Sequence, residues 1–148
     1  MRLTVGENNT TFLGVGAGGG LTENLAYRVD ISNSQSDNWV RNGDSETTMF
    51  SGALQWEATE KLTLTARYDY GDQEPMKYFG TVSENGDVHP GFADENYNTP
   101  DSIVSYEDDS IRLKTEYAVN GTMSFDSEVY RMTSDRIKNM DRQKSRVA

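Results

Sequence analysis

Apolar and polar residues alternate one by one along much of this chain, and this alternation limits its possible folds more than any other feature. In Leu62–Tyr70, apolar side chains occupy every even position, and Thr, Arg and Asp occupy the odd ones. Successive side chains of a strand point to opposite sides, so a period of two predicts a strand with one apolar and one polar face. The same pattern recurs in Leu25–Ser32, Phe50–Trp56, Ile111–Val119 and Met123–Val129.

The order of strands and links predicts an all-β fold. Two weaker segments, Arg2–Gly6 and Thr11–Gly18, bring the total to about seven strands, and no segment shows a helical period. We therefore predict an antiparallel up-and-down meander. Its links are short at 7–10, 19–24, 58–61 and Asn120-Gly121, and longer at 33–46 and 71–109. Successive strands run in opposite directions, so the longer links gather at one end, as in an outer-membrane β-barrel.

Charged residues of both signs lie opposite the aromatic residues. They form the groups Arg28/Asp30, Arg67/Asp69 and Arg112/Lys114/Glu116. In a soluble sandwich this polar face meets solvent, whereas in a membrane barrel it faces a hydrated lumen, with Trp56 and tyrosines at the membrane interfaces. The pattern favours the membrane barrel and leaves a soluble antiparallel β-protein as an alternative.

Composition excludes several other classes of protein. The 148 residues hold 14 Lys+Arg against 24 Asp+Glu, a net charge of −10, which argues against a nucleic-acid partner. Eight Tyr, five Phe and two Trp argue against disorder, and the absence of Cys excludes thiol chemistry. The one histidine, His89, lies in a Gly-rich segment that is typical of an exposed loop. We expect no enzyme, no cofactor and no metal site.

A series of short motifs, in order along the chain, resembles the early barrel strands of TonB-dependent siderophore receptors. A Gly-rich segment, Gly18–Asn24, leads into the strand motif Leu25-Ala26-Tyr27-Arg28. The series continues with Leu54–Leu64, Arg67–Tyr70, Glu74–Thr81, Glu95–Asn98 with Asp101-Ser102, Tyr106–Leu113 and Tyr130–Arg136. Each motif is short, and their order over roughly residues 2–140 carries the resemblance.

The resemblance implies a function and a location. Such receptors lie in the outer membrane of Gram-negative bacteria, contact its lipid, and take up ferric siderophores with energy from TonB, which acts through a plug domain. The extracellular loops contribute to ligand binding. Aromatic and charged loop residues suit a chelate with flat apolar faces and exposed charge. The candidates for this contact are Trp39, Arg41, Lys77, Tyr78, Phe79 and Tyr97.

The family's barrels have more strands than this chain supplies. We therefore expect residues 1–148 to be the N-terminal part of such a barrel, with neither plug domain nor signal peptide and with the barrel incomplete. Seven strands leave two unpaired edges, which are costly in lipid. Two alternatives stay open. One is a small, complete eight-stranded outer-membrane barrel with a structural or adhesive role, and the other is a soluble acidic β-module.

Overall fold

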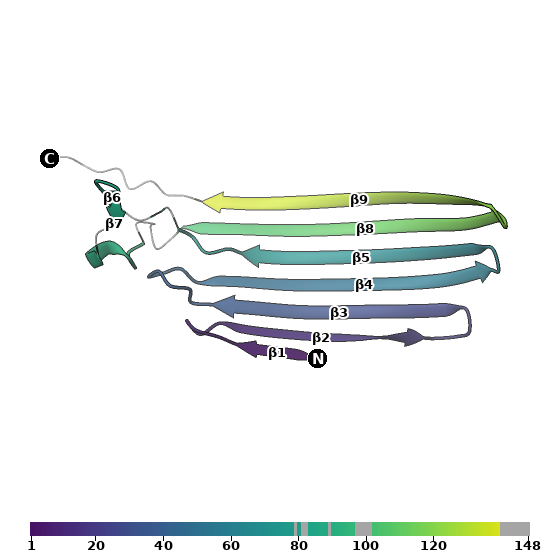
Figure 1. The fold of residues 1–148 in the computed structure, drawn as a ribbon, viewed down its shortest axis with the longest axis horizontal. Coiled ribbons are helices and arrows are strands. Elements are labelled where there is room, and N and C mark those ends of the chain that lie inside the picture. The colour runs from purple at the N-terminus through teal and green to yellow at the C-terminus, as the bar shows by residue number, and fades with distance from the viewer. Residues whose placement is uncertain (79, 81–82, 89, 97–101, 140–148) are drawn as a thin grey trace.

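Seven strands form one antiparallel sheet, in the predicted chain order. The computed structural model describes residues 1–78, 80, 83–88, 90–96 and 102–139. Figure 1 shows the strands side by side in the order β1-β2-β3-β4-β5-β8-β9. Their bounds are β1 (Arg2–Val5), β2 (Thr11–Gly20), β3 (Leu25–Ser36), β4 (Ser45–Thr59), β5 (Leu62–Glu74), β8 (Ile103–Asn120) and β9 (Met123–Asn139). A small hairpin, β6 (Ser83–Glu84) and β7 (Asp87–Val88), and the 3-10 helix η1 (Pro90–Phe92) lie between β5 and β8.

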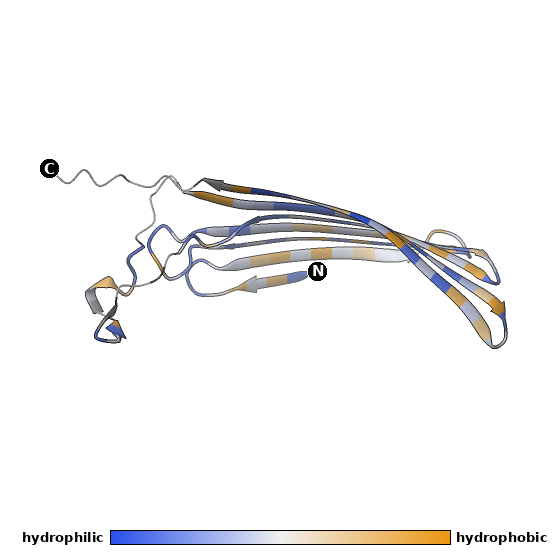
Figure 2. Ribbon diagram, turned by 90° about the horizontal axis from the view of Figure 1, so that it is seen from above, coloured by the Kyte–Doolittle hydropathy of each residue, from blue (hydrophilic) through white to orange (hydrophobic). Residues whose placement is uncertain are grey.

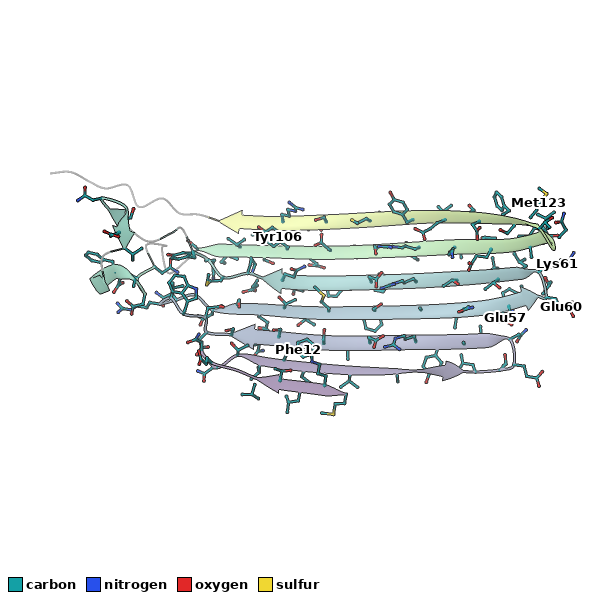
Figure 3. All side chains as sticks on the ribbon, in the orientation of Figure 1. Phe12, Glu57, Glu60, Lys61, Tyr106 and Met123 are labelled. Carbon is teal, nitrogen blue, oxygen red and sulfur yellow. The ribbon has the colours of Figure 1, made fainter. Side chains whose placement is uncertain are left out.

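The links differ between the two ends of the sheet, as expected. At the turn end, strands are joined by residues 21–24, 60–61 and 121–122. At the loop end lie residues 6–10, 37–44 and 75–102. Figure 3 labels Glu60, Lys61 and Met123 at the turn end, opposite the loops. The 60–61 turn also contacts the end of β8, since Lys61 Nζ donates to the Val119 carbonyl at 3.5 Å.

The two longer links are shorter than the sequence predicted, because the strands extend beyond their apolar parts. Predicted links at 33–46 and 71–109 reduce to 37–44 and 75–102. Pairing continues where polar residues occupy both faces, as between Asp72 and Glu107. Asp108 and Asp109, predicted to lie in a loop, belong to β8 and therefore point to opposite faces. Backbone hydrogen bonds form in these polar segments, although their sequence lacks the alternation of apolar and polar residues that predicts a strand.

The registers define an apolar face and a polar face. Leu54 lies opposite Tyr27 on one side and Ala66 on the other, and Ala66 lies opposite Leu113. Paired residues share a face, so these side chains form one apolar row across four strands. Arg67 stands between Ala53 and Arg112 on the polar face. Figure 2 shows the sheet as one curved layer in which polar and apolar residues alternate along the strands.

This single layer buries very little of its surface. Among the described residues, Val40 is the one buried hydrophobic side chain, and it lies in a loop rather than in the sheet. Large side chains of the apolar face remain exposed to solvent, for example Leu54 at 43% and Ile111 at 56% exposure. Backbone pairing therefore holds this sheet together, and the apolar face is left without a protein layer over it.

Glycines in β2 make room on the polar face. Gly14, Gly16 and Gly18 alternate with apolar-face residues and lie beside β3. A Cβ on Gly16 would collide with the carboxylate of Asp30, and one on Gly18 would lie 2.8 Å from the Tyr27 carbonyl oxygen. Gly19 points to the apolar face, and nothing lies within 4 Å of the Cβ that could be added there. The polar-face glycines therefore allow β3 to place the Arg28–Asp30 pair over β2.

Candidate functional site

The described candidate residues gather where two loop-end links meet. Trp39 and Arg41 lie in the 37–44 link, and Lys77 and Tyr78 follow β5. Phe79 and Tyr97, together with His89, lie outside the described residues. We call residues 38–43, 76–78 and 94–96 the loop cluster. Sequence reasoning placed these side chains in separate links, and the structure brings the links together.

An aromatic pair lies in the loop cluster. The rings of Trp39 and Tyr78 meet edge to face, with centroids 5.0 Å apart and planes at 69°. Such pairs are worth about 0.5–1.5 kcal/mol beyond the area that they bury. Trp39 stays 51% exposed, so much of its ring faces solvent. The pair therefore offers a flat apolar surface that is held from two links at once.

Polar contacts fasten the two links to each other. The Arg41 amide donates to the Asp94 carbonyl at 2.9 Å, and the Arg41 guanidinium pairs with Glu95 at 3.1 Å. Asn96 Nδ2 donates to the Lys77 carbonyl at 2.7 Å and to the Asn42 carbonyl at 3.3 Å. Because Asn96 contacts both links, it is the best placed residue to fix the position of Tyr78 against Trp39.

Contacts between residues of the 37–44 link and its flanks determine its conformation. Asn38 adopts a left-handed conformation with φ of 56°, and its Nδ2 donates to the Gly43 carbonyl and to Ser45 Oγ, each at 2.8 Å. The Gly43 amide donates to the Val40 carbonyl at 3.1 Å, and a Cβ on Gly43 would lie 2.5 Å from Val40 Cγ2. The backbone that carries Trp39 and Arg41 is therefore held in place by contacts within its own link.

Several residues of this cluster were not among the predicted candidates. Val40, Asp94, Glu95 and Asn96 hold the cluster together without presenting aromatic or cationic groups to a ligand. Asn38 and Gly43 had a usable signal, since Asn and Gly favour turns and left-handed conformations. Asn96 had no such signal, because the carbonyls of Lys77 and Asn42 that it contacts are far away in the sequence.

Replacing Asn96 with alanine should loosen the loop cluster. The substitution removes both donors to the Lys77 and Asn42 carbonyls, at a local cost of about 1–2 kcal/mol. We expect acrylamide to quench the fluorescence of Trp39 more strongly in this variant, measured in a Trp56→Phe background. Exposed Asn85, which belongs to the β6–β7 turn, provides the control as Asn85→Ala. Equal quenching in both variants would contradict the role given to Asn96.

An acidic rim lies on the apolar face, next to the loops. It consists of Glu46, Asp72, Glu74, Glu107, Asp109 and Asp135. Glu46 stands opposite Glu74, and Glu107 stands between Asp72 and Asp135. Like charges in opposed positions repel each other, and water weakens that repulsion. Hydrogen bonds from Asn33 and then Gln35, at 2.9 and 3.0 Å, hold the pKa of Glu46 below its usual value.

The polar face carries ion pairs within single strands. Arg28 pairs with Asp30 at 2.6 Å, Arg67 with Asp69 at 2.9 Å and Lys114 with Glu116 at 2.7 Å. These are the charged groups that the sequence placed opposite the aromatic residues. Residues two apart share a strand face, so each pair forms within its own strand. Exposed pairs of this kind add little stability.

A broad hollow of about 580 Å³ opens on the polar face beside β2. It is lined by Phe12, Arg28, Asp30, Met49, Arg67 and Asp69. The Arg2 guanidinium lies 5.5 Å from the Phe12 ring centroid, and Arg136 lies equally close to Tyr106. Figure 3 labels Phe12 on β2 and Tyr106 on β8, toward opposite edges of the sheet and both nearer its loop end. Because Arg28 and Arg67 in the lining already pair with Asp30 and Asp69, the hollow is a weaker candidate than the loop cluster.

The described residues define the class of this protein as an all-β chain built on one open antiparallel sheet. Within them, no group of three or more His, Cys, Asp or Glu side chains could hold a metal ion. No helix in this part of the chain has the length and hydropathy needed to cross a membrane. Comparison with protein-family models, curated proteins and solved structures gave no match. The family resemblance therefore rests on the sequence motifs alone.

Proposed function

We propose that this chain forms part of the wall of an outer-membrane β-barrel, in a TonB-dependent receptor that takes up ferric siderophores. In this arrangement the apolar face meets lipid and the polar face lines the lumen. The loop end projects from the cell, and the loop cluster contacts the siderophore. The observation that carries the proposal is the slope of the apolar band across the sheet.

The level at which the apolar runs end shifts across the sheet, although the runs of β3, β4 and β5 end level with one another. Toward the loop end, the continuous apolar runs end at Val5, Leu13, Ile31, Phe50, Tyr70, Ile111 and Val129. On the same face, Ile103 of β8 and Ile137 of β9 lie nearer the loops, separated from these runs by the charged residues of the rim. Traced through the registers, Val5 lies level with Glu74 of β5, whereas Val129 lies level with Ala66. At about 3.4 Å per residue, these levels are about 27 Å apart along β5.

The slope has the size that a membrane barrel requires. From β1 to β9 the sheet is about 29 Å wide at about 4.8 Å per strand spacing, so the boundary runs at about 43° to the line across the strands. Strands of outer-membrane barrels tilt by about 35–45° from the membrane normal. When strands tilt by this angle, the plane of the membrane makes the same angle with the line drawn across the strands. A soluble sheet packed against a second layer has no reason to place its apolar boundary on such a slope.

Aromatic and charged residues border the band as a membrane interface favours. Trp56, Tyr117 and Phe125 lie toward the turn end of the apolar face, and Phe50 and Tyr70 lie toward the loop end. Interfacial girdles of outer-membrane barrels have this composition. Beyond Tyr70 the acidic rim begins, where its repelling carboxylates need water. The loop cluster then lies beyond the rim, on the side where the ligand of such a receptor arrives.

The two tryptophans of the chain allow a direct test with brominated lipid, which quenches nearby indole rings. We expect brominated phosphatidylcholine vesicles to reduce the emission of the Trp39→Phe variant about twofold, because its remaining Trp56 lies in the lipid interface. The Trp56→Phe variant, which keeps Trp39 in the loop cluster, should lose little emission in the same vesicles. Equal quenching of the two variants, or none, would contradict the proposed membrane face.

The same variants separate the ligand site from the membrane face. Ferric tris-catecholate and ferric tris-hydroxamate chelates serve as probes. Binding at the loop cluster should quench Trp39 in the Trp56→Phe variant and leave Trp56 in the Trp39→Phe variant unchanged. A chelate that quenches neither tryptophan, in a chain that passes the lipid test, removes the ligand assignment and leaves the membrane assignment standing.

A further inference from the structure

The two links that form the loop cluster carry an excess of negative charge. In the sequence, Arg41 and Lys77 are the only Lys or Arg residues of segments 37–44 and 75–102. The same segments hold seven carboxylates, at Asp37, Asp44, Glu84, Asp87, Asp94, Glu95 and Asp101. Arg41 already pairs with Glu95 at 3.1 Å, so its guanidinium is engaged within the cluster. The cluster therefore offers an anionic ligand very little positive charge.

The carboxylates next to the loop cluster have neutral partners. A hollow of about 270 Å³ beside the 37–44 link has no Lys or Arg among its described lining residues. Its charged lining residues are Asp37, Asp44, Glu46 and Glu74. Asn9 Nδ2 donates to Asp37 at 2.5 Å, and the donors to Glu46 are side-chain amides as well. Neutral donors leave the negative charge in place, so these carboxylates act on an approaching ligand through their field.

Trp39 offers a surface on which a cation can lie. Its side chain is 51% exposed and its ring is held against Tyr78. In the part of the chain that the structure describes, the cation–aromatic contacts involve Phe12 and Tyr106 and leave Trp39 to a ligand. Tryptophan attracts ammonium groups more strongly than the other aromatic side chains do, because the face of its ring is negative. The aromatic pair and the field around it therefore favour the same sign of charge in a ligand.

We infer that the loop cluster selects ferric chelates that carry a positive charge and rejects anionic ones. This inference rests on the proposed function, which places the chelate at the loop cluster. The class of ligand that fits is a tris-hydroxamate chelate with a protonated amine. Each hydroxamate loses one proton, so three of them leave Fe³⁺ neutral, and the ammonium group adds one positive charge. A tris-catecholate loses two protons per arm and carries three negative charges, which the carboxylates near Trp39 repel.

Two chelates that differ only in charge test this selection. One is a linear ferric tris-hydroxamate that ends in a primary amine, and the other is the same chelate with that amine acetylated. The protein is the Trp56→Phe variant in phosphatidylcholine vesicles at neutral pH. We expect the amine form to quench Trp39 at an about fivefold lower concentration than the acetylated form. In about 0.5 M sodium chloride the preference should fall to about twofold, because salt screens exposed charges.

Paired substitutions in the same background locate the charges that set the preference. Asp37→Asn together with Asp44→Asn removes two negative charges from the link that carries Trp39 and keeps an oxygen acceptor at each position. We expect this double variant to prefer the amine form only about twofold. Glu57→Gln together with Glu60→Gln removes the same charge at the turn end, where Figure 3 labels both residues. This matched control should keep the about fivefold preference, because the turn end lies more than a Debye length away.

The outcomes separate this inference from the proposed function. Equal affinity for the amine and acetylated chelates, or tighter binding of a ferric tris-catecholate, overturns the charge selection and leaves the proposed function standing. The same loss of preference in both double variants overturns it too, because the charge near Trp39 would then have no special effect. If none of the three chelates quenches Trp39 in a protein that passes the brominated-lipid test, the ligand assignment falls and this inference falls with it.

Discussion

Replacing Leu54 with arginine should weaken vesicle binding by about 2–4 kcal/mol, the largest effect that we expect from a single substitution. Leu54 lies in the middle of the apolar face, with Tyr27 and Ala66 opposite it. A guanidinium at this depth either loses its water or pulls the sheet out of the bilayer. The measurement is the urea concentration at which half of the protein leaves the vesicles, in flotation assays at constant lipid.

The neighbouring residue supplies the control for this substitution. Gln55 belongs to the same strand and points to the polar face, where its partners are Ala26 and Thr65. Gln55→Arg adds the same charge to a face that already carries Arg28 and Arg67, so vesicle binding should change by less than about 1 kcal/mol. Equal losses in the two variants would show that the apolar face does not meet lipid.

Replacing Gly18 with valine should destabilise the sheet by about 1–3 kcal/mol, a cost typical of overpacking. The new Cβ would lie 2.8 Å from the Tyr27 carbonyl oxygen and 3.3 Å from the Cα of Arg28. Both atoms belong to the backbone of β3, so they yield only if the pairing of β2 with β3 is distorted. Urea denaturation in dodecylmaltoside micelles, followed by tyrosine and tryptophan emission, measures the loss.

Gly19 is the matched control, one residue further along β2. It points to the apolar face, where an added Cβ has nothing within 4 Å. Gly19→Val adds a β-branched residue to a strand and should leave stability unchanged or raise it by a few tenths of a kcal/mol. A destabilisation like that of Gly18→Val would mean that loss of glycine flexibility, rather than contact with β3, sets the cost.

Sequence alone was sufficient for the strand order and for the two faces. The alternation in Leu62–Tyr70 depends on which side chains leave the water, so it is visible without knowing any partner strand. Asn120-Gly121 likewise marks a tight hairpin through its own backbone preferences. The neighbouring-strand topology follows from these local signals, because each strand of the main sheet pairs with the next one in the chain.

The strand ends and the loop cluster could not be predicted in the same way. Between Gly71 and Glu74 both faces of β5 are polar, so pairing there depends on backbone hydrogen bonds that leave no mark on composition. Trp39 and Tyr78 were each selected as loop aromatics, but their 5.0 Å contact depends on Asn96 and Arg41 joining distant links. Such contacts arise from how β3, β4 and β5 place their ends beside each other.

The link from 75 to 102 also affects the order in which the sheet forms. The other links between neighbouring strands of the main sheet span eight residues or fewer, so those pairs close smaller loops. Closing the β5–β8 pair costs about 2 kcal/mol more chain entropy than closing the turn at 60–61. The contacts of Arg41 and Asn96 hold part of this link against the 37–44 segment and so reduce the freedom that remains to be lost. The residues that position Trp39 and Tyr78 therefore also lower the entropy cost of joining β8–β9 to the other strands.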